Sequence, residues 1–134
     1  MTEKLPLLID HVSLSVDDLA VARAFYVKLL EPLDVEVVSD LSAEVAGVAC
    51  SGFGRSGKSS FWIVENGPQT PRAHVCFRAR NREDVRTFHR AGLAAGGTDN
   101  GAPGIREVYH PAYYAACVLD PEGHNIEAVC FEPE

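Results

Sequence analysis

The feature that most constrains the fold of this chain is an internal repeat that begins at two histidines, His11 and His74. The stretches HVSLSVDDLAVARAFYVKLL and HVCFRARNREDVRTFHRAGL start 63 positions apart. At that offset the identical pairs are His11/His74, Val12/Val75, Arg23/Arg86, Phe25/Phe88 and Leu30/Leu93. A strand-then-helix unit that occurs twice predicts two similar modules that pack together, because a single sheet cannot cover its own apolar face.

Size and composition place the chain among ordinary globular proteins. With 134 residues, 46% of them hydrophobic and 23% charged, it is long enough for one domain with a real core. The net charge of -7 and the lack of Lys or Arg runs give no support for nucleic-acid or anionic-membrane binding. We also expect no secretory signal and no membrane span, since neither an apolar signal core nor a long apolar run occurs.

Module one is expected to span about residues 5–66. Residues 9–16 alternate with period two, which predicts a strand, and Asp17 or Asp18 can cap the helix that follows. Glu31-Pro32 should end that helix. Further strands are predicted near 35–39, 45–50 and 60–65, with a loop over 51–58.

Module two is expected to span about residues 72–132 and to repeat the same order. A strand over 73–79 precedes a helix capped by Asn81 and ended by Gly96-Gly97. Strands are predicted near 105–109, 113–119 and 125–131, after a loop over 101–104. The fold class is therefore α+β, with two βαβββ modules in one domain.

Three side chains form a candidate metal site. His11 and His74 occupy equivalent strand positions and could converge between pseudo-symmetric modules, and Glu127 lies in the last predicted strand. A carboxylate among Ile, Ala and Val is costly to bury unless a cation or an arginine accompanies it. Two histidines and one carboxylate leave open positions on a divalent metal for water or substrate.

The chain resembles the vicinal oxygen chelate superfamily, also called the glyoxalase/bleomycin-resistance/extradiol-dioxygenase family. The resemblance rests on runs that cover nearly the whole sequence: Ile9–Val16, Phe25-Tyr26, Phe61–Ile63, Ala73–Val75 and Leu119–Glu127. It implies a fold of two βαβββ modules that form a curled, barrel-like mixed sheet around a cleft, with His11, His74 and Glu127 at the positions of metal ligands. The best match to the family's fourth ligand is Trp62, which cannot bind a metal, so fosfomycin-resistance and dioxygenase relatives fit better than glyoxalase I.

The resemblance implies an enzyme that uses one divalent ion (Mn, Fe, Ni or Zn) to stabilise an oxyanion or enolate of a small oxygen-rich substrate. Tyr113 and His110 are candidate proton donors or bases, and Trp62, Arg78 and Tyr114 are candidate substrate contacts. Arg78 could instead pair with Glu127. The alternative is a metal-free protein that sequesters small molecules, as bleomycin-resistance proteins do, in a cleft lined by Trp62, Tyr113 and Phe131.

Assembly and location are also expectations at this point. Relatives commonly form homodimers, so a homodimer is expected, although the sequence leaves open whether the modules pair within one chain or between two. The four cysteines lack any C-x-x-C spacing and fall in strand-like runs. We therefore expect inert core thiols and a cytoplasmic protein.

Overall fold

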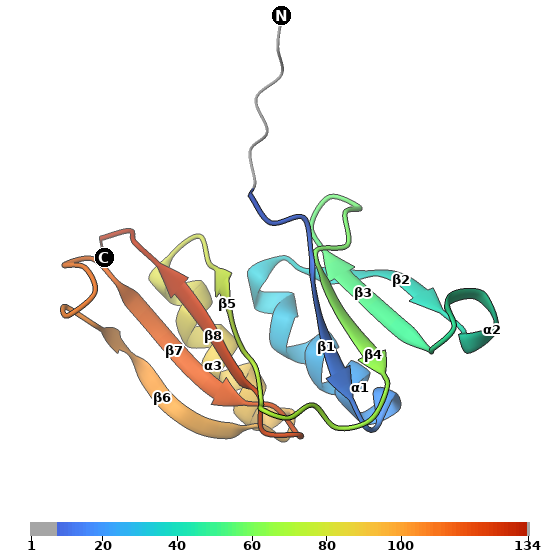
Figure 1. Ribbon diagram of the computed structural model, residues 1–134. Coiled ribbons are helices and arrows are strands. Elements are labelled where there is room, and N and C mark those ends of the chain that lie inside the picture. The colour runs from blue at the N-terminus through green and yellow to red at the C-terminus, as the bar shows by residue number, and fades with distance from the viewer. Residues whose placement is uncertain (1–7, 134) are drawn as a thin grey trace, which may run out of the picture.

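The computed structural model describes residues 8–133, so the predicted start of module one near residue 5 lies outside the described residues. Two four-stranded mixed sheets, one from each half of the chain, confirm the predicted α+β class. The sheets are curled neighbours and do not close into a barrel (Figure 1). No helix within residues 8–133 has the length and apolarity needed to cross a membrane.

The first sheet has the strand order β1-β4-β3-β2. Its elements are β1 (Val12–Val16), α1 (Leu19–Leu30), the short 3-10 helix η1 (Glu31–Leu33), β2 (Glu36–Leu41), α2 (Ala43–Ala46), β3 (Cys50–Gly54) and β4 (Phe61–Glu65). Strand β1 runs parallel to β4, and the other neighbours are antiparallel. Asp18 caps α1 by accepting a hydrogen bond from the Val21 amide.

The second sheet repeats this order as β5-β8-β7-β6. Its elements are β5 (His74–Arg78), α3 (Arg82–Ala94), β6 (Thr98–Ile105), β7 (Tyr114–Leu119) and β8 (Asn125–Cys130). Strand β5 is parallel to β8, in the same way that β1 is parallel to β4. The predicted cap Asn81 accepts from the Asp84 amide at the start of α3.

Four predicted segments were wrong: the strands at 45–50 and 105–109, and the loops at 51–58 and 101–104, since residues 51–54 belong to β3. Residues 45–50 do not form a strand: the short helix α2 ends at Gly47, whose φ of +89° suits glycine, and β3 starts only at Cys50. Residues 101–104 are not a loop but part of β6, whereas the predicted strand at 105–109 is mostly a turn. Strand β6 accommodates its glycines and proline because it is an edge strand with irregular register against β7.

A single apolar core joins the two modules. Figure 1 shows α1 and α3 on the same side of the two sheets, and both helices contribute to one buried cluster with the strands. Its members from the two modules include Leu14, Val16, Phe25, Val85, Phe88, Ile126 and Ala128. Since each sheet buries the face that meets this helical layer, the face that carries His74 and Cys76 is left largely exposed.

Hydrogen bonds between the modules hold their arrangement near the linker at 66–73. The carboxylate of Glu122, in the turn before β8, accepts hydrogen bonds from the backbone amides of Asp17 and Asp18 at the start of α1. The side chain of Gln69 accepts from the Ser15 amide on β1. These contacts connect the linker and the second module to the first strand and helix of module one.

Candidate functional site

Glu127 is the centre of the candidate site. It lies in β8 with only 7% of its surface exposed, and both of its carboxylate oxygens have partners. His74 Nε2 lies 2.8 Å from Oε1, and the Tyr113 hydroxyl donates to Oε2 at 2.6 Å. A buried carboxylate requires this kind of compensation, because an unpaired charge would be costly to remove from water.

The strand register explains why these groups meet. Cys76 on β5 and Cys117 on β7 are the direct neighbours of Glu127 across the sheet. His74 is two residues before Cys76, so it projects from the same face of β5. Desolvation and then the Glu127 carboxylate raise the pKa of Cys76 to about 12 and that of Cys117 to about 11.

The sequence-based expectation of four core cysteines is therefore wrong for this pair. Cys50 and Cys130 are buried, but Cys76 is exposed and Cys117 is partly exposed, and all four thiols are free. The period-two pattern in β5 placed Cys76 on the face of His74. The missing information was that β8 lies between β5 and β7, which brings both thiols beside Glu127.

Phe131, the residue after β8, contacts three of the predicted site residues: Tyr113, His110 and Arg78. The rings of Tyr113 and His110 each meet the Phe131 ring edge-on at a centroid distance of 5.4 Å. The Arg78 guanidinium lies over the same ring, 4.7 Å from its centroid. Within residues 8–133 no ion pair joins Arg78 to Glu127, so the arginine does not compete for that carboxylate.

Tyr113 is poised as a hydrogen-bond donor. Desolvation, followed by the hydrogen bond to Glu127 and the charge of that carboxylate, raises the pKa of its hydroxyl above the ordinary tyrosine value. The phenol therefore stays protonated at neutral pH. It can orient the Glu127 carboxylate by donating its hydrogen bond, but it is neither a ready acid nor a ready base.

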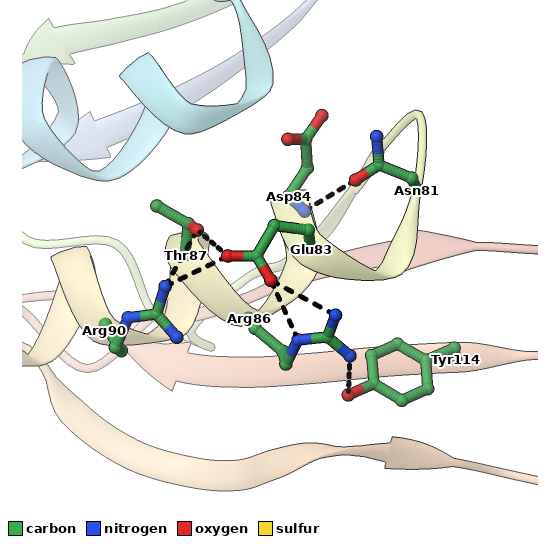
Figure 2. A network of polar contacts seen from close by, with 7 residues as sticks. All are labelled: Asn81, Glu83, Asp84, Arg86, Thr87, Arg90 and Tyr114. Carbon is green, nitrogen blue, oxygen red and sulfur yellow. Dashed lines mark hydrogen bonds and ion pairs between the residues drawn. The ribbon is translucent and has the colours of Figure 1, made fainter. Parts of the chain in front are cut away.

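Tyr114 lies away from this group. Its ring packs beside α3, with the Arg82 guanidinium 4.8 Å from its centroid, and its hydroxyl accepts from Arg86 at 3.4 Å. Figure 2 shows Arg86 linking Tyr114 to Glu83 within a polar network along α3. Because neighbouring strand residues face opposite sides, Tyr113 and Tyr114 cannot both approach Glu127.

His11 and Trp62 belong to the first sheet. His11 precedes β1, and its Nδ1 lies 2.8 Å from the Asp10 carboxylate, which also accepts from Lys58. Trp62 sits in β4 between Ser13 of β1 and Gly52 of β3. Among residues 8–133 no three His, Cys, Asp or Glu side chains gather in a way that could hold a metal. One chain thus brings together His74 and Glu127 but not His11.

Comparison with known proteins places the chain in a family. Residues 8–128 match the Glyoxalase/Bleomycin resistance protein/Dioxygenase superfamily. A glyoxalase/bleomycin resistance protein from Albidiferax ferrireducens T118 is 29% identical with a TM-score of 0.75, over 95% of this chain and 100% of that one. A search of curated proteins gives no significant match.

Two structures of lower identity share the fold. One is a mutant of the fosfomycin resistance protein FosX from Listeria monocytogenes, complexed with Mn(II) and 1S,2S-dihydroxypropylphosphonic acid. It is 19% identical with a TM-score of 0.65, over 96% of this chain and 90% of that one. The other is lactoylglutathione lyase from Agrobacterium tumefaciens, at 18% identity and a TM-score of 0.67, over 94% and 95% of the two chains. The chain therefore belongs to the Glyoxalase/Bleomycin resistance protein/Dioxygenase superfamily.

Proposed function

We propose that this protein is a metal-dependent enzyme that holds one divalent ion with His74, Glu127 and the His11 of a second copy. Its substrate would be a small molecule that offers two neighbouring oxygens. The observation that carries this proposal is the contact between His74 and the buried Glu127 carboxylate, two groups from adjacent strands that converge at 2.8 Å.

The donor chemistry fits such an ion. Imidazole nitrogen and carboxylate oxygen together suit Mn, Fe, Ni or Zn, and three protein ligands leave places for substrate oxygens. A bound ion would supply Lewis-acid stabilisation of an oxyanion or enolate. Tyr113 would orient the Glu127 carboxylate from its other oxygen by donating the hydrogen bond of its protonated hydroxyl.

A second copy is the proposed source of His11. Within one chain the two long helices lie on one side of both sheets (Figure 1), and the opposite sides keep exposed residues such as Ser13 of β1 and His74 of β5. The side chains of His11 and His74 are 52% and 55% exposed. Pairing the first sheet of one copy with the second sheet of another would cover both faces and bring the third ligand to Glu127.

Metal analysis of the purified protein tests this proposal. After loading with Mn, Fe, Ni or Zn and removal of excess ion, we expect one ion per chain by elemental analysis. His74→Ala, Glu127→Gln and His11→Ala should each lower the content by at least about tenfold. His89→Gln is a matched control, because His89 lies on α3 and bonds Asp99 instead. Unchanged metal content in the Glu127→Gln variant would show that the proposal is wrong.

One observation favours a second candidate function, a metal-free small-molecule binder. Both oxygens of Glu127 are already satisfied by His74 and Tyr113, so the carboxylate can stay buried without a cation. Protein that takes up none of the four ions, yet gains thermal stability from small organic ligands, would support this function instead.

The cellular location is also proposed on chemical grounds. All four cysteines are free thiols. Free thiols persist in a reducing compartment, which favours the cytoplasm.

A further inference from the structure

A cavity lies between the two modules of one chain. It has a volume of about 330 Å³ and is lined from module one by residues after η1, in β3 and β4 and in the loop between them, and from module two by the end of β5. This volume falls within the range of about 300–1,000 Å³ that is typical of small-molecule sites. None of the residues proposed to hold a metal lines it.

The apolar part of this cavity is aromatic and comes from both modules. Phe53 and Phe61 are fully buried, and the Phe61 ring meets the Phe77 ring of β5 edge-on at 5.1 Å. Val35 completes the apolar lining. Phe53 and Phe61 therefore form a buried floor, and a hydrocarbon or aryl group placed here would leave water against the partly exposed Phe77 ring.

The charged part of the lining is entirely basic. Arg55, Lys58 and Arg78 line the cavity, and no acidic residue does. This concentration of positive charge is notable in a chain whose net charge is -7. The nearest acid in the contacts of these side chains is Asp10, which is exposed and accepts a hydrogen bond from Lys58. The potential at the cavity therefore favours an anion over a cation.

Arg55 ties this cavity to the way the modules pack. Its guanidinium donates to the Leu33 carbonyl in module one and to the Arg78 carbonyl in module two. A ligand bound beside Arg55 would contact both modules. Binding should therefore stabilise the packing of the modules, in addition to placing the ligand's negative charge near basic side chains.

We propose that this cavity binds a small amphiphilic anion, an aryl or alkyl carboxylate whose hydrocarbon part packs on the partly exposed Phe77 ring, which the buried Phe61 supports, and whose carboxylate lies near Lys58 and Arg78. The site is separate from the Glu127 centre and does not depend on a metal ion.

Three ligands with one hydrocarbon skeleton and different charge test the proposal. Calorimetric titration of the full chain with 4-phenylbutyrate, 4-phenylbutanol and 4-phenylbutylamine should give the tightest binding for the carboxylate. We expect it to bind at least about tenfold more tightly than the alcohol, which corresponds to about 1.4 kcal/mol, and the amine more weakly still. Equal affinities, or no binding of any of the three at millimolar concentration, would overturn the proposal.

Variants locate the site. Lys58→Met combined with Arg78→Met should abolish the preference for the carboxylate over the alcohol, and Lys58→Met alone, in an exposed loop, should reduce it if the double variant does not fold. Lys28→Met, at the last turn of α1, removes one positive charge elsewhere and should change nothing. Phe77→Leu should weaken the acid and the alcohol together, because both share the hydrocarbon contact.

The Glu127 centre must also be excluded as the place of binding. A chain carrying both His74→Ala and Glu127→Gln should bind 4-phenylbutyrate as the unaltered protein does. Loss of binding in that variant would place the ligand at Glu127 and contradict the proposal, whatever the metal analysis shows. Retained binding supports the cavity even if the proposed metal function fails.

Discussion

Glu127 has more functional groups around it than its position in the sequence indicates. It is a buried carboxylate with an imidazole on one oxygen, a phenol on the other and a thiol on each neighbouring strand. The charge of this one side chain contributes to the raised pKa of both thiols and of Tyr113. At neutral pH these three groups therefore stay protonated beside the Glu127 carboxylate.

Tyr113 and Tyr114 give a matched pair of substitutions. Tyr113→Phe removes the hydroxyl that holds Glu127, so on the proposed function it should weaken metal affinity by about tenfold or more. Tyr114→Phe removes a hydroxyl that contacts Arg86, so metal affinity should stay the same. Competition with a fluorescent chelator measures both constants. Equal effects of the two substitutions would contradict the role assigned to Tyr113.

Contacts between elements hold the first helix in place from two directions. Glu122 caps the start of α1 from the turn before β8, and Arg23 on α1 forms a two-bond ion pair with Asp40 on β2. Both contacts join segments far apart in the sequence. Each can be removed by a substitution on the surface without touching the apolar core.

Loss of the Glu122 cap should lower the stability of the protein by a measurable amount. Glu122→Ala leaves the amides of Asp17 and Asp18 to water, and it should lower the free energy of unfolding by about 1 kcal/mol. Urea denaturation measures the change. Glu44→Ala, an exposed acid in the short helix α2, is the control and should be nearly neutral. If Glu122→Ala lowers the free energy of unfolding no more than the control does, the Glu122 cap contributes little to stability.

The Arg23–Asp40 pair predicts a dependence of stability on pH. Hydrogen bonds from Arg23 and then from Ser51 lower the pKa of Asp40 in the folded protein. A lowered folded-state pKa adds stability above the unfolded value of about 3.9, and this stability is lost as pH falls through the folded pKa. Since the pair is about half exposed, solvent screening limits its contribution to roughly 0.5 kcal/mol.

Arg23→Gln should therefore destabilise the protein at pH 7, and its stability should converge with that of the unaltered chain as pH falls from 7 through the lowered pKa of Asp40. Urea denaturation across this range checks the result. A difference that is constant with pH would show that Arg23 acts through packing of its side chain and not through the charge of Asp40.

Mixing two defective chains tests the proposed assembly. If each metal site takes His11 from one copy and His74 with Glu127 from the other, refolding His11→Ala with Glu127→Gln in equal amounts restores intact sites in the mixed dimers. Random pairing should recover about one quarter of the metal content of the unaltered protein. If all three ligands belonged to one chain, mixing would restore none. Light scattering of the unaltered chain should give the mass of two copies.

How far the sequence predicts this structure differs between regions. The repeat at His11 and His74 predicts two modules and their helices, with Asn81 as one cap and Asp17 or Asp18 as the other, because capping and periodicity are local properties; the structure settles the choice on Asp18. Strand β6 was mistaken for a loop because its glycines and proline are tolerated only at a sheet edge. Whether a strand is an edge is decided by its neighbours and not by its own residues.

The candidate site, too, was predictable from the sequence only in part. Alternation within β5 and β8 already placed His74, Cys76 and Glu127 on definite faces, since side-chain direction follows from the backbone period. Only the pairing of β8 with both β5 and β7 put the thiols and Tyr113 around Glu127. Likewise, the shared helical core decided that both sheets turn their open faces outward and that His11 lies apart from Glu127. Local patterns fix which face a residue occupies, whereas the burial of apolar surface between distant segments fixes what that face meets.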